Sequence, residues 1–301
     1  MDMVSGKKGA DIQAHLAPSA KPRSPWAIAF AQLLRNKGAM IGLIVFAIIV
    51  LCSIFAAELA PYDPLLMSPQ DYLQPPNKTH WFGTDSYGRD VLSRTLHGGR
   101  VSLTVGLFSV VVAGLFGVLL GLVAGYYRGP ADGIIMRFID VLLAFPGLLL
   151  ALGVVALLGP GLANVIIAVG IAGIPSYART VRGSVLSARE EVYVDAARSV
   201  GCRGSHIVLR HLLPNVVGII VVISTLSIAW AILTASSLSF LGVGTQPPTP
   251  EWGVMVSEGR GLLREAPWLT TFPGLMIVLT VLSVNLFGDG LRDALDPRMY
   301  Q

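Results

Sequence analysis

Charge is what this sequence most lacks. Only 13% of its 301 residues are charged and 53% are hydrophobic, whereas roughly 25% of residues are charged in soluble domains. So little solvating surface excludes an ordinary soluble globular protein. The apolar residues come in long blocks, and one bilayer crossing takes about 20 of them. We therefore predict an all-α membrane protein with six transmembrane helices, at 38–60, 101–127, 138–158, 162–178, 215–241 and 269–288.

Cysteine is also scarce, and metal-ligand spacings are missing. Cys52 and Cys202 are the two cysteines, and they form no CxxC pair, so we expect neither a disulfide nor a metal site. His206 and His211 are five residues apart, and we expect them on different faces of a helix. The first apolar block starts near residue 38 and is too long for the core of a signal peptide, so we expect no cleavable signal.

Motifs that carry enzyme chemistry are absent as well. The sequence holds no nucleophile elbow and no HExxH. The stretch GTDSYGRD at 83–90 has the glycine spacing of a phosphate loop, but Arg89 and Asp90 stand where that loop needs Lys and Ser or Thr. We predict that this chain has no catalytic site and binds no cofactor itself.

The predicted spans have few ionisable residues. Glu58, Asp140 and Asp289 fall at span ends, and none falls near a predicted midplane. Carriers driven by an ion gradient use buried carboxylates or histidines to couple transport to that gradient. A gradient-driven secondary transporter is therefore the less favoured alternative.

Basic residues set the expected orientation. With the N-terminus inside, 16 Lys and Arg residues fall on the inner side and six on the outer side. The excess of positive charge marks the cytoplasmic side, so we expect both termini in the cytoplasm. Because this charge reports membrane topology, we do not take it as a sign of nucleic-acid binding, and we expect no nucleic-acid partner. Within the tail, PWAIAFAQLLRNK (25–37) places Trp26, Phe30, Leu33 and Leu34 on one face. We expect an interfacial helix; the alternative is that this segment lengthens the first span.

One polar segment, DAARSVGCRGSHIVLRHLLPN (195–215), separates two apolar blocks. Just upstream, the spacing from Glu190 predicts a short helix with one apolar stripe. Its acidic residues lie in the first turns, where the helix dipole favours anions, and Gly201 stands where a left-handed cap is needed. We expect Pro214 to end a second short helix and to begin the next span. On these grounds a connector and a docking element are equally favoured.

The residues in this segment resemble the EAA loop of ABC importer permeases. Ala196, Ala197, Gly201 and the run His211-Leu212-Leu213-Pro214 carry that resemblance, with Asp195 in place of the Glu and His211 in place of an Ile. Three further stretches resemble the second, C-type permease subunit of the dipeptide, oligopeptide, glutathione and nickel importers. They are HWFGTDSYGRDVLSR (80–94), SLSFLGVGTQPPTPEWG (237–253) and NLFGDGLRDALDPR (285–298).

The resemblance implies a type I ABC importer permease fold in the bacterial inner membrane. It implies a cytoplasmic tail (1–37), a first transmembrane helix (38–60), a periplasmic segment (61–97), a type-1 ABC transmembrane domain (98–290) and a cytoplasmic tail (291–301). The implied partners are a homologous permease, two ATPase subunits that hold ATP and Mg, and a substrate-binding protein.

Within that domain, the EAA loop at 189–214 would couple to an ATPase. The implied coupling residues are Glu190, Glu191, Tyr193, Asp195, Ala196, Ala197, Val200, Gly201, Leu213 and Pro214. The outer loops 61–100 and 242–268 would dock the binding protein, through Glu251, Trp252, Glu258 and Glu265; the alternative is a structural lid.

Short peptides are the favoured substrate. No face rich in Met, His or Cys suggests a path for a soft metal. Import of chelated nickel remains the alternative.

Overall fold

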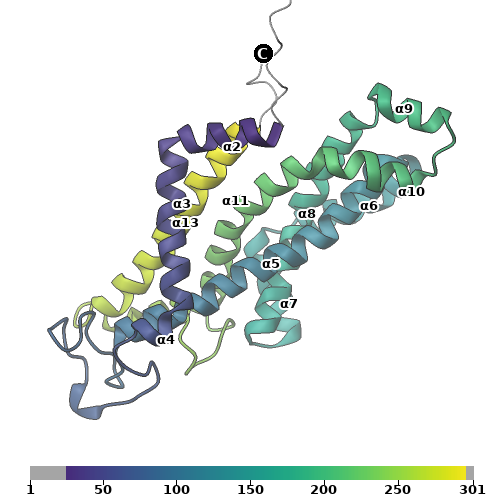
Figure 1. Ribbon diagram of the computed structural model, residues 1–301. Helices are drawn as coiled ribbons and strands as arrows, with labels where there is room; N and C mark the ends of the chain where they lie inside the picture. Colours follow the sequence, from purple (N-terminus) through teal and green to yellow (C-terminus); the bar gives the residue numbers. More distant parts are fainter. Residues whose placement is uncertain (1–24, 296–301) are drawn as a thin grey trace, which may run out of the picture.

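The computed structural model describes residues 25–295, and the regular elements in that range are helices (Figure 1). In chain order they are α2 (Pro25–Arg35), α3 (Lys37–Ile54), α4 (Ala56–Leu59), η2 (Pro69–Asp71), α5 (Val91–Tyr127), α6 (Gly129–Leu143), α7 (Gly147–Leu158), α8 (Leu162–Ala188), α9 (Val192–Ser199), α10 (Gly204–Ile207), the π-helical turn η3 (Val208–Leu212), α11 (Leu213–Phe240), α12 (Trp252–Gly259), η4 (Arg260–Leu262) and α13 (Trp268–Leu295).

Six membrane crossings account for the path of the chain. Five helical stretches in the described part are long and apolar enough to span a bilayer, and α6 with α7 forms a sixth crossing bent by 91°. The two described ends, Pro25 and Leu295, lie at the same end of the bundle as α9 (Figure 1). An even number of crossings is therefore required, so the bent pair counts as one. The expectation of six spans is confirmed.

Several span boundaries differ from the prediction. The helix α3 ends at Ile54 instead of residue 60, α5 begins at Val91 instead of residue 101, and α13 continues to Leu295 instead of residue 288. The 138–158 block is not one straight helix, because Pro146 has no N–H and the residue before a proline disfavours helical geometry; α6 ends at Leu143 and α7 starts at Gly147. The 162–178 block is longer than expected, since α8 continues to Ala188. In this added part of α8, Arg179 and Arg182 pair with Asp140 and Asp132 of α6. Hydropathy alone does not reveal these ion pairs.

Glycines on α5 allow it to pack closely against α8. A Cβ atom on Gly117 would lie 2.4 Å from the Cβ of Tyr177, and one on Gly121 would lie 2.7 Å from the carbonyl oxygen of Ala178. Small residues let membrane helices approach to backbone contact. The small residues Ala113, Gly117, Gly121 and Gly125, which recur at every fourth position of the sequence, thus lie at the interface between α5 and α8 at the centre of the bundle.

The N-terminal helix α2 is separate from the first span and lies across the ends of α3 and α13 (Figure 1). Asn36 breaks the chain between α2 and α3, and its side chain accepts a hydrogen bond from the Ala39 N–H at 3.1 Å. Leu33 is buried against α3 and α13, whereas Phe30 and Leu34 are exposed. The side chain of Trp26 and the tail segments 1–24 and 296–301, together with the predictions made for them, lie outside the described residues.

Candidate functional site

The helix expected over 190–201 exists as α9 and ends as its sequence predicts. Gly201 has φ +79°, and its N–H donates to the carbonyl oxygen of Arg198 at 2.9 Å. The Cys202 N–H donates to the carbonyl oxygen of Ala197 at 3.1 Å. These two bonds are the pair that defines a Schellman cap, which favours glycine because the left-handed region strains any side chain.

Two side chains fasten α9 to the membrane helices. Val194 and Ala197 are buried and pack into an apolar cluster formed by α5, α8, α10, η3 and α11. Arg189 fixes the start of the loop, since its guanidinium donates to the carbonyl oxygen of Tyr126 at 2.7 Å at the end of α5. The helix is therefore held rigidly on the bundle.

The opposite side of α9 is apolar and uncovered. Val192 is 82% exposed and Val200 is 79% exposed, and Tyr193 and Ala196 lie on the surface between them. The predicted stripe consists of Tyr193, Ala196, Ala197 and Val200; three of these are exposed, but Ala197 is buried against the bundle, so the prediction of a single face is wrong for Ala197. Single exposed apolar side chains are common, but several on one short helix mark an interaction surface.

Charged side chains border this apolar surface. Glu190 pairs with Arg128 at 2.7 Å, and Asp195 pairs with Arg198 at 3.0 Å. Glu191 is the N-cap residue, although its side chain makes no capping hydrogen bond. Partial burial, and secondarily the Glu191 carboxylate, raises the pKa of Tyr193 above its ordinary value, so its phenol stays neutral at physiological pH.

The segment after α9 corrects two expectations. Pro214 does not end a short helix, because α10, η3 and α11 form one continuous stretch from Gly204 to Phe240. A π-turn precedes the proline, with the Leu213 N–H bonded to the carbonyl oxygen of Val208. Five-residue spacing brings side chains together in a π-turn, so the rings of His206 and His211 lie 5.7 Å apart and do share a face. Within 25–295, no cluster of three or more His, Cys, Asp or Glu residues is suited to a metal ion.

At the opposite end of the molecule, two of the residues expected to dock a binding protein are buried. The Glu251 carboxylate caps α12 by accepting from the N–H groups of Gly253 at 2.9 Å and Val254 at 3.0 Å. The Trp252 indole N–H donates to the carbonyl oxygen of Thr95 at 2.9 Å, and its side chain is fully buried. Both residues fasten α12 to α5, so in this conformation they offer no surface to another protein.

The other two acidic residues of this region are accessible to different extents. Glu265 is exposed. Glu258 is 29% exposed at its side chain and pairs with the buried Arg94 at 2.8 Å. Arg94 and Arg89 also contact the Asp85 carboxylate, at 3.2 and 2.6 Å. This four-residue ion cluster (Asp85, Arg89, Arg94 and Glu258) joins the outer loop to α5 and α12.

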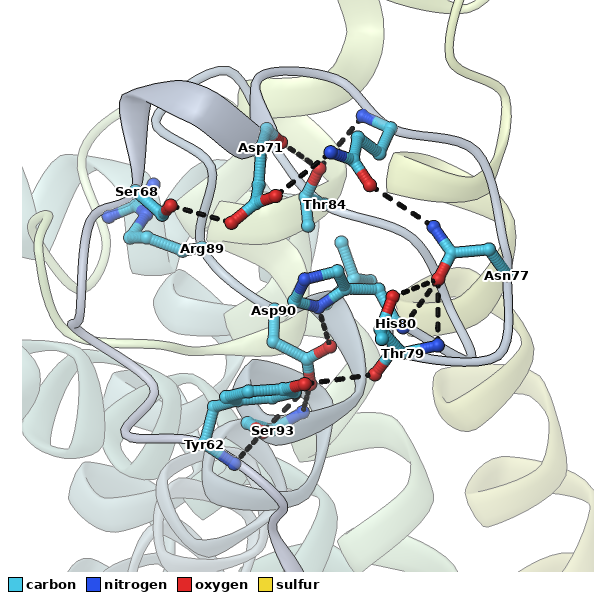
Figure 2. A network of polar contacts seen from close by, with 12 residues as sticks. Tyr62, Ser68, Asp71, Asn77, Thr79, His80, Thr84, Arg89, Asp90 and Ser93 are labelled. Atoms are coloured by element: carbon cyan, nitrogen blue, oxygen red, sulfur yellow. Dashed lines mark hydrogen bonds and ion pairs between the residues drawn. The ribbon is translucent and has the colours of Figure 1, made fainter.

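Figure 2 shows that the outer loop itself is built around buried polar contacts. The His80 Nδ1 atom lies 3.0 Å from the Asp90 carboxylate, which also accepts from the N–H and the hydroxyl of Ser93 at 2.8 Å each. Asn77 accepts from the N–H groups of Thr79 and His80 at 2.8 Å. The 83–90 stretch is therefore a structural turn. The density of Asp, Asn and Thr in this loop is the sequence signal that could have indicated it.

The interior of the bundle contains a cavity of about 470 Å³ between α5, α6, α7, α8 and α11. Its lining is mostly apolar, with hydroxyl groups from Ser109, Ser176 and Ser227 and the indole of Trp230. Its lining residue Tyr177 donates to the Ser224 hydroxyl at 3.0 Å. None of these interior residues was predicted, since serines in apolar helices carry no distinctive spacing.

Known proteins match this chain along most of its length. Residues 117–301 match the family model of the binding-protein-dependent transport system inner membrane component, and residues 24–76 match the N-terminal transmembrane domain of oligopeptide transport permease C. The chain is 48% identical to the dipeptide transport system permease protein DppC of Alkalihalophilus pseudofirmus, over 92% of this chain and 91% of that protein. It is 49% identical to the glutathione transport system permease protein GsiD of Pectobacterium atrosepticum, over 92% of each.

A solved structure shares the fold. A chain of the MetNI methionine ABC transporter, in an inward-facing conformation, superposes with a TM-score of 0.53 at 18% identity, over 67% of this chain and 96% of that chain. At that identity the likeness concerns the fold alone. With the matched family model covering more than half of the sequence, the chain belongs to the inner-membrane permease components of binding-protein-dependent ABC transport systems.

Proposed function

We propose that this permease imports short peptides, of the dipeptide and glutathione size, with energy supplied by ATPase subunits docked on α9. The observation that carries the proposal is the exposed apolar surface of α9, held rigidly on the bundle. The polar groups of the 83–90 turn are hydrogen-bonded to one another and to His80 and Ser93, which supports a structural role for this turn. In this proposal the energy for transport enters from outside the chain, through α9.

The contacts of α9 suit the transmission of a displacement from this helix to the membrane helices. Val194 and Ala197 anchor it to α8 and α11, which cross the membrane and line the interior cavity. A displacement of α9 by a closing ATPase pair is therefore passed to the helices around the cavity. In this proposal α9 and both chain ends face the cytoplasm, in accord with the excess of Lys and Arg expected on that side from the sequence.

The substrate class rests on the relatives. The dipeptide and glutathione permeases at 48% and 49% identity are named for short peptides. The remaining partners follow from the same relationship. A second, homologous permease closes the substrate path, two ATPases bind ATP and Mg, and a binding protein delivers the peptide to the outer end. For that delivery we retain the exposed Glu265 and the partly exposed Glu258 as docking residues.

Reconstituted uptake tests the proposal. The two permeases, two ATPases and the binding protein are placed in proteoliposomes, and uptake of radiolabelled alanyl-alanine and glutathione is measured beside ATP hydrolysis. We expect ATP-dependent uptake of at least one of these peptides. Uptake of chelated nickel in the absence of any peptide uptake would contradict the substrate class. Wild-type ATPase association with a permease lacking residues 190–201 would contradict the role of α9.

A further inference from the structure

The least expected feature of the membrane region is an exposed ion pair beside the interior cavity. The Arg179 guanidinium of α8 lies 2.7 Å from the Asp140 carboxylate of α6, and each side chain is 58% exposed. Hydropathy predicts Asp140 at the end of a span and Arg179 in a cytoplasmic loop. The structure places both within membrane crossings, because α8 continues beyond Arg179 and α6 begins 11 residues before Asp140.

The depth of the pair follows from helix length. With 27 residues, α8 is about 40 Å long at 1.5 Å per residue, compared with about 30 Å for the hydrocarbon core. Arg179 is nine residues from the end of α8, or about 14 Å. With α8 centred on the bilayer, the helix overshoots the core by only about 5 Å at each end, and this placement puts the pair within the hydrocarbon depth. Charges there face water or protein, because exposure to lipid is costly.

The surroundings of the Asp140–Arg179 pair favour contact with water over contact with lipid. Gly173 and Ser176 of α8 line the cavity, and Arg179 is the next residue at this three-residue spacing. On the bent crossing, Leu143 and Gly147 line the cavity, and Asp140 is three residues before Leu143. Asp140 and Arg179 are thus each three residues beyond a residue of the cavity lining, on the side nearer α9, and neither belongs to that lining. The bend between α6 and α7 leaves irregular backbone at this depth, which is tolerated where it is buried in protein or lines a cavity.

A neighbouring ion pair provides an internal comparison. Asp132 and Arg182 join the same two helices through two bonds of 2.6 and 2.7 Å, but their side chains are only 17% and 30% exposed. That pair has the burial of a structural tie between α6 and α8. The exposure of the Asp140–Arg179 pair is not needed for that purpose.

We propose that Asp140 and Arg179 form a station on the substrate path that binds both charged ends of a short peptide. The carboxylate of Asp140 receives the terminal ammonium group, and the guanidinium of Arg179 receives the terminal carboxylate in the bidentate geometry that suits it. In the absence of peptide the two side chains neutralise each other. The adjacent cavity, with its hydroxyls and Trp230, accommodates the peptide body. This inference rests on the proposed peptide import.

Thiol accessibility tests whether the station lies on a water path. Asp140→Cys and Arg179→Cys are made singly in a Cys52→Ser, Cys202→Ser background, and the assembled transporter in nanodiscs is treated with a charged, membrane-impermeant methanethiosulfonate. We expect labelling at both positions to be at least about tenfold faster than at Asp132→Cys. We also expect slower labelling at both positions when alanyl-alanine and the loaded binding protein are present. No labelling at 140 and 179 in any nucleotide state would overturn the proposal.

Transport assays separate contact with substrate from a structural role. We expect Asp140→Asn and Arg179→Gln to lower alanyl-alanine uptake at least about tenfold while ATP hydrolysis stimulated by the binding protein stays within about twofold. The exchanged double variant, Asp140→Arg with Arg179→Asp, restores an ion pair; we expect it to assemble normally but not to regain uptake. Full recovery of uptake in the exchanged variant would show a structural tie and overturn the proposal.

The controls keep the two proposals apart. Asp132→Asn should leave uptake per assembled transporter unchanged within about twofold. If the wild-type transporter takes up alanyl-alanine while both station variants do so normally, the station is wrong and peptide import stands. If the wild type takes up no peptide at all, the proposed function fails and the station falls with it.

Discussion

The two ends of the molecule differ in how they place their charged side chains. At the outer end, charged residues such as Arg89, Arg94 and Asp90 are buried and paired. At the end that carries α9, valines are exposed and charged groups lie on the surface. The outer end pairs its buried charges within the chain, although its loop also exposes apolar side chains such as Leu66, Tyr72 and Trp81. The α9 end leaves an apolar surface uncovered, which is the condition expected of a surface completed by another subunit.

The largest loss of stability is expected from a change in the outer ion cluster of Asp85, Arg89, Arg94 and Glu258. Arg94→Met removes one partner from Asp85 and Glu258 in a site where Arg94 is 1% exposed. Breaking a buried ion pair costs about 3–5 kcal/mol, so we expect a large loss of stability. Thermal unfolding of the purified permease in detergent measures it. The control is Arg264→Met, which changes an exposed residue of the same end. An equal loss of stability in both variants would show that the cluster adds no stability.

A smaller effect on stability, but a larger one on function, is expected at the cap of α9. Gly201 has φ +79°, and a Cβ atom added to it would meet no other atom within 4 Å. Gly201→Val therefore strains the backbone, at roughly 1–2 kcal/mol, without a clash inside the chain. We expect the variant to insert into the membrane and to lose peptide uptake. Gly218→Val serves as the control, since Gly218 is helical with equally open surroundings. Normal peptide uptake in Gly201→Val would show that the helix cap is not needed for transport.

The exposed valines separate docking from folding. Val192→Glu and Val200→Lys each place a charge where the helix dipole of α9 favours it, and both positions are exposed. We expect stability to change by less than about 0.5 kcal/mol, as for most surface substitutions, while ATPase subunits no longer co-purify and uptake is lost. Ser199→Ala, an exposed change on the same helix, should retain both. Co-purification of ATPases with the double variant would disprove docking on this surface.

The smallest effect is expected at Glu265. This residue is exposed, so Glu265→Lys should leave stability unchanged but weaken binding-protein association several-fold at low salt, with the difference fading as salt is added. Surface plasmon resonance against the reconstituted complex measures this. Glu251→Gln should instead lower stability without a salt-dependent change in association, because its carboxylate caps α12. A salt-dependent loss in Glu251→Gln and none in Glu265→Lys would reverse this assignment.

Features that depend on neighbours in the sequence were predicted well. The Schellman cap at Gly201 follows from a glycine placed after a periodic helix, and the glycine ridge of α5 follows from four-residue spacing. Features that depend on distant partners were not. The burial of Glu251 requires Ser102, 149 residues away, and nothing in the local pattern distinguishes a capping glutamate from a surface one.

The sequence by itself determined that this protein crosses a membrane, how many times it does so, and where its polar loop carries a capped helix. These properties follow from hydropathy, residue spacing and glycine, which act over one or two helical turns. Tertiary structure alone decided that Arg179 and Asp140 form an ion pair, and that only one side of α9 is free. Each of these depends on which helices pack together, because a side chain becomes buried, paired or exposed only when its neighbours are in place.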